Sequence, residues 1–251
     1  MSIVRDFIEQ ENTGRIQEFS SDFCTLEAVK SKKMAWDKQG IVTVFIAGVF
    51  DLPTPSHRFA LIEARMVAAA NSLGIDYASL ESRTSNEALC QVMAKAATES
   101  VKLIISVDTD DNVIKNKAFQ PEKGDCPRPI FGWETRAYNL ASYVIPNGNG
   151  TSHYIADYIT RHGVNSCQFC TQNKCPSRDN ALMVAKLQPD LVVVNTASTK
   201  TVETILREKE KGRLPHTQIW FRDERDHHFI DDLLGGHVST TSIVQRIKEV
   251  Q

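Results

Sequence analysis

The chain has 251 residues, of which 41% are hydrophobic and 24% charged, and its formal net charge is −2. These values are typical of a globular protein with a sizeable core, and they argue against non-specific nucleic-acid binding, because the phosphate backbone attracts basic surfaces. The polar first residues, and a sequence without an apolar run long enough to span a bilayer, predict a cytoplasmic protein with no membrane partner.

The first predicted strand and helix set the pattern of the chain. We expect a helical N-terminal extension over 1–40 and one α/β domain over 41–251. Residues 41–48, IVTVFIAG, form a β-branched and aromatic run that is typical of a strand buried on both faces of a parallel sheet. From His57 onward apolar residues recur at helical spacing, and Gly74 is placed to end that helix. Strand, short loop and helix form the first half of a βαβ unit.

The same alternation continues to the C-terminus. Further helices are expected over 87–97, 132–143, 153–162, 178–187, 201–212 and 241–250. Further strands are expected over 103–107, 143–145, 191–195 and 218–221. This order predicts an α/β fold: a doubly wound, Rossmann-like parallel sheet with helices on both faces. Such sheets bind ligands at the carboxyl ends of their strands, near a topological switch point.

The stretch GVFDLPTPSH, residues 48–57, follows the first predicted strand. One interpretation is a turn, punctuated by Pro53 and Pro55, in which Ser56 caps the next helix. The other is a phosphate site, because helix N-termini, backbone N–H groups, hydroxyls and histidine attract phosphate. Taken alone, the stretch leaves both interpretations open.

Two later stretches also bring anion-binding groups to the ends of predicted elements. VDTDDNVIKNKAFQPEKGDCPRPIFGWETR, residues 107–136, follows a predicted strand and carries Lys117 and Arg128. GGHVSTTSIVQRI, residues 235–247, places three consecutive hydroxyls and free N–H groups at a helix start. Arg246 lies about one turn into that helix, within reach of a bound phosphate.

In this order, the three stretches resemble the nucleotidylyltransferase superfamily with an (H/T)xGH signature. The resemblance is to its cytidylyltransferase-like members, glycerol-3-phosphate cytidylyltransferase and the nucleotidyl-transfer domain of ADP-heptose synthase. It implies transfer of CMP or AMP from CTP or ATP to a small phosphorylated acceptor, a sugar or polyol phosphate. Pyrophosphate is released, and Mg²⁺ bridges the phosphates. Segments near 75–101 and 146–180 look like insertions relative to the smallest members.

The resemblance also implies roles for individual residues. Thr54 and His57 match the first and last signature positions, and with Lys117 they form the expected catalytic group. The expected nucleotide-binding residues are Gly48, Val49, Phe50, Asp51, Ser56, Arg128, Ser239, Thr240, Thr241 and Arg246. Asp108, Asp110, Glu134 and Arg136 also match family positions.

One departure from the family pattern keeps a second function open. Ser56 stands where the family usually has glycine, and its Cβ crowds the place where a nucleotide passes the backbone. The alternative is therefore a non-catalytic nucleotide-binding or regulatory protein on the same fold. The expected partners are small molecules and not nucleic acid, with a homodimer as a possible assembly.

The cysteine-rich segment CQFCTQNKC lies outside this pattern. Cys167, Cys170 and Cys175 have the spacing of zinc ligands, with His162, His153 or Cys126 as the candidates for a fourth. Free thiols in a loop explain the same spacing equally well, and a disulfide is not expected in the cytoplasm.

Overall fold

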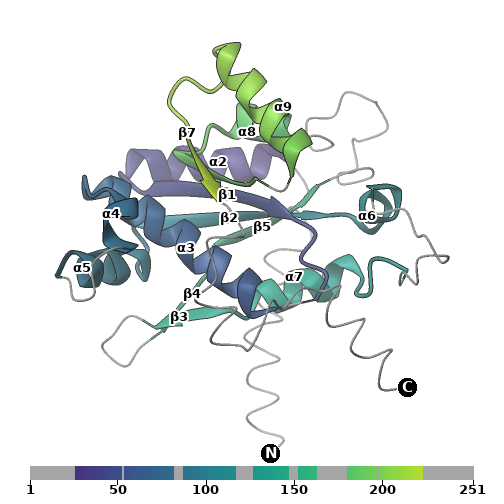
Figure 1. Ribbon diagram of the computed structural model, residues 1–251, viewed down its shortest axis with the longest axis horizontal. Helices are drawn as coiled ribbons and strands as arrows, with labels where there is room; N and C mark the ends of the chain where they lie inside the picture. Colours follow the sequence, from purple (N-terminus) through teal and green to yellow (C-terminus); the bar gives the residue numbers. More distant parts are fainter. Residues whose placement is uncertain are drawn as a thin grey trace, which may run out of the picture.

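The computed structural model describes residues 26–52, 54–81, 87–116, 127–146, 152–162, 180–196 and 198–222. A five-stranded sheet lies at its centre, in the order β5–β2–β1–β6–β7, and every pair of neighbours is parallel (Figure 1). The strands are β1 (Val42–Gly48), β2 (Val101–Asp108), β5 (Tyr158–His162), β6 (Leu191–Asn195) and β7 (Gln218–Arg222). The predicted α/β fold with a Rossmann-like parallel sheet is confirmed.

β1 is the middle strand, as its apolar run predicts. Val44, Phe45 and Ile46 are buried consecutively, so both faces of the strand are covered. The one polar residue among them, Thr43, is also buried, and its N–H and hydroxyl both donate to Asp190 Oδ2, at 2.8 and 2.7 Å. A buried hydroxyl paired in this way does not oppose burial of the strand.

Helices cover both faces of the sheet (Figure 1). α3 (Pro55–Ser72) and α7 (Trp133–Ala141) lie on one face, whereas α2 (Leu26–Lys38), α8 (Asn180–Leu187) and α9 (Thr199–Glu210) lie on the other. This division follows from right-handed crossovers, because the chain moves toward β5 in the first half and toward β7 in the second. Among the described helices, none is both long and apolar enough to cross a membrane.

The predicted helix over 153–162 is wrong. These residues belong mainly to two strands, β4 (Ser152–Tyr154) and β5. Tyr154 and Tyr158 stand four residues apart, which imitates a helical period, but residues 158–160 are all buried because β5 is covered on both faces. The strand expected at 143–145 exists as β3 (Val144–Pro146), but it pairs antiparallel with β4 in a separate two-stranded sheet.

Segments expected as extensions or insertions supply packed elements. α2 lies within the expected extension, and its Val29 is 1% exposed in the common core; residues 1–25 lie outside the described part. Two short helices that the sequence pattern did not predict are α4 (Tyr77–Glu81) and α6 (Asp110–Asn116). α5 (Glu87–Ala96) buries Val92 and Ala96, and β5 extends the main sheet.

Candidate functional site

The stretch after β1 lies at the topological switch point of the sheet. From β1 the chain crosses to β2 on one side, and β6 returns to pair with β1 on the other side. Loops that leave neighbouring strands in opposite directions open a crevice at their carboxyl ends, which is where ligands bind in sheets of this kind. The N-terminus of α3 follows β1 directly and so faces that crevice.

A capping box fixes the start of α3. Thr54 is the N-cap, and its hydroxyl accepts a hydrogen bond from the backbone N–H of His57 at 3.3 Å. In return, His57 Nδ1 lies 3.3 Å from the backbone N of Thr54. Pro55 occupies the first turn, where its missing N–H costs nothing. The prediction that His57 lies in the first turn of this helix is therefore confirmed.

The His57 ring is held in one orientation. Nδ1 lies 2.9 Å from the Leu52 carbonyl oxygen, and the ring packs edge-on against Phe50 with centroids 5.5 Å apart. Because a carbonyl oxygen only accepts, the 2.9 Å contact with Leu52 needs a proton on Nδ1, and Nδ1 then cannot also accept from the Thr54 N–H. In either form Nε2 lies on the far side of the ring from Leu52. The His57 ring therefore stands at the positive end of α3, where the helix dipole and the backbone N–H groups suit an anion.

Asp51 is buried and anchors the segment that precedes α7. It is 2% exposed, and its Oδ1 accepts hydrogen bonds from the backbone N–H groups of Ile130 and Phe131, at 2.8 and 3.0 Å. Its Oδ2 lies 3.4 Å from Arg128 Nε in an ion pair. Asp51 Oδ2 and Arg128 Nη2 are nevertheless buried with no hydrogen-bond partner within the described part of the chain. Unsatisfied buried polar atoms are costly, and here they mark a place where a ligand or water would be stabilised.

Arg136 clamps the carboxyl ends of β1 and β2 together. The residue is fully buried, and its guanidinium donates to the carbonyl oxygens of Val49 at 2.5 Å and Asp108 at 2.7 Å. It also donates to Phe131 O at 3.0 Å and pairs with Asp110 Oδ1 at 2.6 Å. Because its donors are used within the protein, Arg136 positions the loops and is not available for substrate.

The acidic pair after β2 is tied down in the same way. Asp110 Oδ2 accepts from the backbone N–H of Trp133 at 3.2 Å, and Asp108 Oδ1 accepts from the Asn112 amide at 2.8 Å. Glu134, on α7, is exposed. These contacts hold α6 and α7 against the end of β2.

The loop after β1 is tightly curled. Phe50 has a φ of 50°, and a Cβ built on Gly48 would lie 3.0 Å from the Phe50 ring. A side chain at Gly48 would therefore displace the ring that packs against His57. Val49 and Ser56 are half-buried, and Ser56 lies in the first turn of α3.

Several predicted site residues lie outside the described part of the chain. They are Lys117, Ser239, Thr240, Thr241, Arg246 and the three cysteines Cys167, Cys170 and Cys175. Their roles stay predictions. The described site thus consists of the loop after β1, the start of α3, and Arg128 from the segment that Asp51 anchors.

The structure adds two residues that sequence reasoning missed. Arg161 lies at the carboxyl end of β5, and its guanidinium lies over the Trp133 ring, 4.2 Å from the ring centroid. Trp133 is itself held by a hydrogen bond from its Nε1 to Val107 O, at 3.2 Å. The signal that would have found Arg161 is a strand over 158–162, which the helical spacing of the tyrosines concealed.

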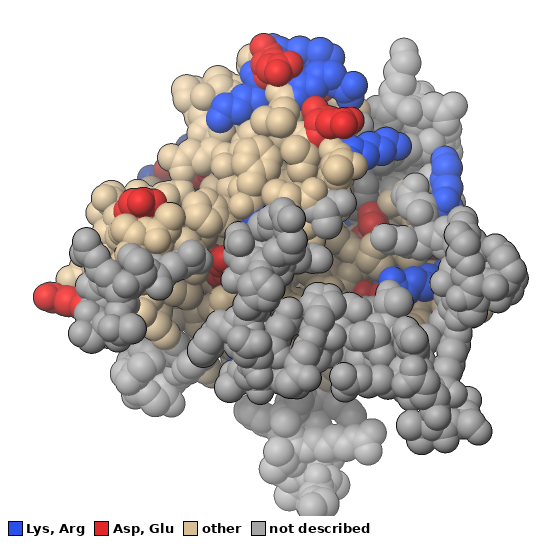
Figure 2. Space-filling view, in the orientation of Figure 1, with Lys and Arg blue, Asp and Glu red and all other residues tan. Residues whose placement is uncertain are grey.

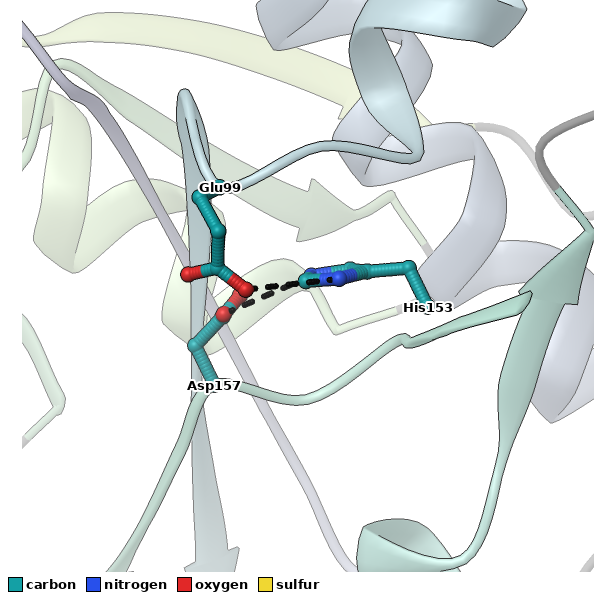
Figure 3. Close-up of side chains that lie close together, drawn as sticks. All are labelled: Glu99, His153 and Asp157. Carbon is teal, nitrogen blue, oxygen red and sulfur yellow. Dashed lines mark ion pairs between the residues drawn. The ribbon is translucent and has the colours of Figure 1, made fainter. Parts of the chain in front are cut away.

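A second cluster lies at the opposite, amino-terminal edge of the sheet. Glu99, His153 and Asp157 offer ligand atoms within 4.8 Å of one another (Figure 3). His153 Nδ1 lies 3.4 Å from Glu99 Oε1, and His153 Nε2 lies 3.7 Å from Asp157 Oδ1. Lys102 pairs with both carboxylates, and Arg65 donates to Asp157 at 2.5 Å. The positively charged side chains of Lys102 and Arg65 already neutralise these two carboxylates. The cluster is therefore an ion-pair network and a poor metal site.

This network lowers the pKa of Asp157. Burial alone would raise the pKa of this carboxyl. The contacts of Asp157 together outweigh burial and lower its pKa. They are the hydrogen bond with His153, the charges of Arg65 and Lys102, and the Leu103 N–H, which donates to Asp157 Oδ2 at 2.8 Å. Asp157 therefore stays charged at pH values at which an ordinary aspartate side chain would bind a proton.

The exposed surface of α9 carries charges of both signs. Figure 2 shows Lys and Arg side chains gathered at the top of the molecule with acidic side chains among them. α9 contributes Lys200, Arg207 and Lys209, interspersed with Glu203 and Glu210. Such mixing is typical of a solvated helix face and differs from the basic stripe that tracks nucleic acid.

Comparison with known proteins adds no relative. No protein-family model matches the sequence, and a search of curated proteins finds no match. The functional assignment therefore rests on the geometry of the described residues.

Proposed function

We propose that the chain is a nucleotidylyltransferase that moves CMP or AMP from CTP or ATP to a small phosphorylated acceptor. The observation that carries this proposal is the position of His57 and Thr54. Both stand at the N-terminus of an 18-residue helix, at the switch point of a parallel sheet. This place supplies a helix dipole, backbone N–H groups and a fixed imidazole to one anion.

The chemistry asks for positioning more than for a reactive side chain. An acceptor phosphate oxygen attacks the α-phosphorus in line, and pyrophosphate leaves without a covalent enzyme intermediate. With Nδ1 held by Leu52 O, His57 presents Nε2 to the α-phosphate and stabilises charge that grows in the transition state. Arg128, whose Nη2 has no hydrogen-bond partner among the described residues, is placed to bind an outer phosphate.

The donor set at this edge suits a magnesium ion that arrives with the triphosphate. Asp108 and Asp110 are bound by protein donors, and Asp51 Oδ2 lies beside the Arg128 guanidinium, which repels a cation. Phosphate oxygens are therefore the expected ligands of Mg²⁺, which would supply charge neutralisation on the triphosphate.

A binding screen followed by an activity assay tests this proposal. Thermal melts of the full chain with CTP, ATP, GTP and UTP in Mg²⁺ identify the nucleotide, since a ligand at about 100 times its Kd adds roughly 2.7 kcal/mol of stability. Pyrophosphate release is then measured with a panel of sugar and polyol phosphates. Absence of any nucleotide-dependent shift would contradict the proposal.

Ser56 is the reason to test a second candidate function, non-catalytic nucleotide binding. A nucleotide-dependent shift without pyrophosphate release for any acceptor would favour a non-catalytic nucleotide-binding or regulatory protein. The half-buried Ser56 side chain at the start of α3 is the feature that favours this alternative.

A further inference from the structure

Arg161 and Trp133 form a pair at the carboxyl edge that the proposed chemistry has not used. The guanidinium lies 4.2 Å from the Trp133 ring centroid, within the range of a cation–π contact. Trp133 begins α7, where Asp110 binds its backbone N–H and Val107 O binds its indole N–H. The ring is therefore a fixed platform, and it holds the guanidinium in one plane.

The charge of Arg161 is not balanced within the described part of the chain. Arg161 forms no ion pair with a described residue, and its Nε is buried without a hydrogen-bond partner there. By contrast, Arg65 and Arg136, which are fully buried, each bind four acceptors. A guanidinium that stacks by its face keeps its N–H edge for an oxyanion, and two parallel N–H groups match phosphate.

Strand register brings Arg161 level with the loop that follows β1. Gly48 pairs with Val107 on β2, and Val107 pairs with Arg161 on β5. Two strand spacings separate Gly48 from Arg161, about 10 Å. α3 and α7 cover the same face of the sheet (Figure 1), so the start of α3 and Trp133, over which the Arg161 guanidinium lies, are on the same side of the sheet.

We propose that Arg161, stacked on Trp133, binds the phosphate of the acceptor substrate. This inference rests on the proposed nucleotidyl transfer and names the residue that selects its second substrate. The acceptor is a phosphate monoester, and its phosphate bridges from Arg161 toward the α-phosphate at His57. One oxygen of that phosphate attacks the α-phosphorus and forms a P–O–P bond. The bond to the β-phosphate breaks, and pyrophosphate leaves with its electron pair.

Calorimetric titration of the full chain tests Arg161 without requiring turnover. The probes are glycerol 3-phosphate and ribose 5-phosphate, with glycerol and ribose as uncharged controls. The nucleotide found in the melting screen is titrated separately. We expect Arg161→Gln to weaken monoester binding roughly 10- to 100-fold, the usual loss for a charge-assisted bidentate contact, and to leave nucleotide binding within about twofold.

Matched variants separate this role from a structural one. Arg161→Lys keeps the charge but not the planar fork, so intermediate affinity is expected. Arg207→Gln makes the same change on the exposed face of α9 and should bind monoesters as the original chain does. Melting temperatures show that each variant is folded.

Each outcome decides a different question. The inference is overturned if Arg161→Gln binds monoesters as tightly as the original chain, or if the original chain binds none. In either case, nucleotide binding by the original chain would still support the proposed function. Loss of nucleotide affinity instead of monoester affinity assigns Arg161 to the triphosphate and also overturns it. If no nucleotide binds at all, the proposed function fails, and the acceptor role of Arg161 fails with it.

Discussion

The two edges of the same sheet differ in how completely their buried arginines and aspartates are paired. At the amino-terminal edge, Arg65 donates to three carbonyl oxygens and to Asp157, which also pairs with Lys102. At the carboxyl-terminal edge, Asp51, Arg128 and Arg161 each keep a buried polar atom with no hydrogen-bond partner among the described residues. The buried Arg65 and Asp157 use their polar atoms within the chain and stabilise the fold, although His153 Nε2 beside them has no hydrogen-bond partner among the described residues. The unsatisfied atoms of Asp51, Arg128 and Arg161 would be stabilised by a group that binds at the carboxyl-terminal edge.

The charge balance at the amino-terminal edge also argues against a metal site at the cluster of Glu99, His153 and Asp157. Glu99, His153 and Asp157 lie close together (Figure 3), yet their carboxylates are neutralised by cations from the chain. The loop after β1 has no such cluster among its described residues, but it has a helix N-terminus and a fixed imidazole. Proximity of ligand atoms is therefore a weaker guide to function than the balance of charge around them.

The strongest effect is expected on stability, at the amino-terminal edge. Asp157→Asn keeps the shape of the side chain but removes the charge that balances Arg65, which is fully buried. Uncompensated buried charge typically costs about 3–5 kcal/mol. Urea unfolding measures the loss, and nucleotide binding by the folded fraction should be unchanged.

Two checks accompany this variant. Glu87→Gln removes the charge of an exposed carboxylate whose hydrogen-bond partner Gln91, one helical turn away, is also exposed, and it should cost no more than about 0.5 kcal/mol. Because the pKa of Asp157 is lowered in the folded chain, its stabilisation is present above the usual value of 3.8 and is lost as pH falls below it. In Asp157→Asn the free energy of unfolding should therefore fall less steeply as the pH is lowered through this range. An unchanged pH dependence would contradict the pairing.

The next effect in size is on turnover, at the carboxyl-terminal edge. His57→Ala should lower pyrophosphate release roughly 100- to 1000-fold, equal to about 2.7–4 kcal/mol, because one donor to the developing charge is lost. His57→Asn keeps an amide donor without the charge, so partial activity at best is expected. His216→Ala removes an exposed histidine away from the site and is the matched control. Full activity in a folded His57→Ala chain would show that His57 caps the helix but takes no part in catalysis.

Thr54 belongs to both the fold and the proposed site, so its variants separate stability from turnover. Thr54→Ala removes the N-cap of α3 and should cost about 1 kcal/mol of stability, and Thr54→Ser should restore it. If the hydroxyl also contacts phosphate, Thr54→Ala lowers turnover in protein that is fully folded at the assay temperature. Equal turnover in folded Thr54→Ala and the original chain would limit Thr54 to capping.

The weakest effect is expected at Ser56. Ser56→Gly removes a half-buried side chain beside the expected path of the nucleotide, so pyrophosphate release should rise or stay the same. Glycine in the first turn should cost less than about 1 kcal/mol of stability. A clear loss of turnover would show that the Ser56 hydroxyl itself takes part.

Local signals in the sequence were enough to predict the order of most strands and helices. The run over 41–48 has no polar alternation, so it required cover on both faces, and it became the middle strand β1. The helix that follows His57 shows an uninterrupted apolar period, which only a helix packed on that sheet satisfies. Each of these signals depends on residues within one or two turns of the chain.

The roles of the charged residues, in contrast, follow from tertiary contacts. Arg136 and Arg161 look alike in the sequence. The guanidinium of Arg136 donates to the carbonyl oxygens of Val49 and Asp108, whereas the guanidinium of Arg161 lies over the Trp133 ring. The residues over 153–162 have spacing that fits a helix, and pairing with β2 made residues 158–162 a strand instead. Long-range pairing and charge balance depend on partners far away in the chain, and no local pattern encodes them.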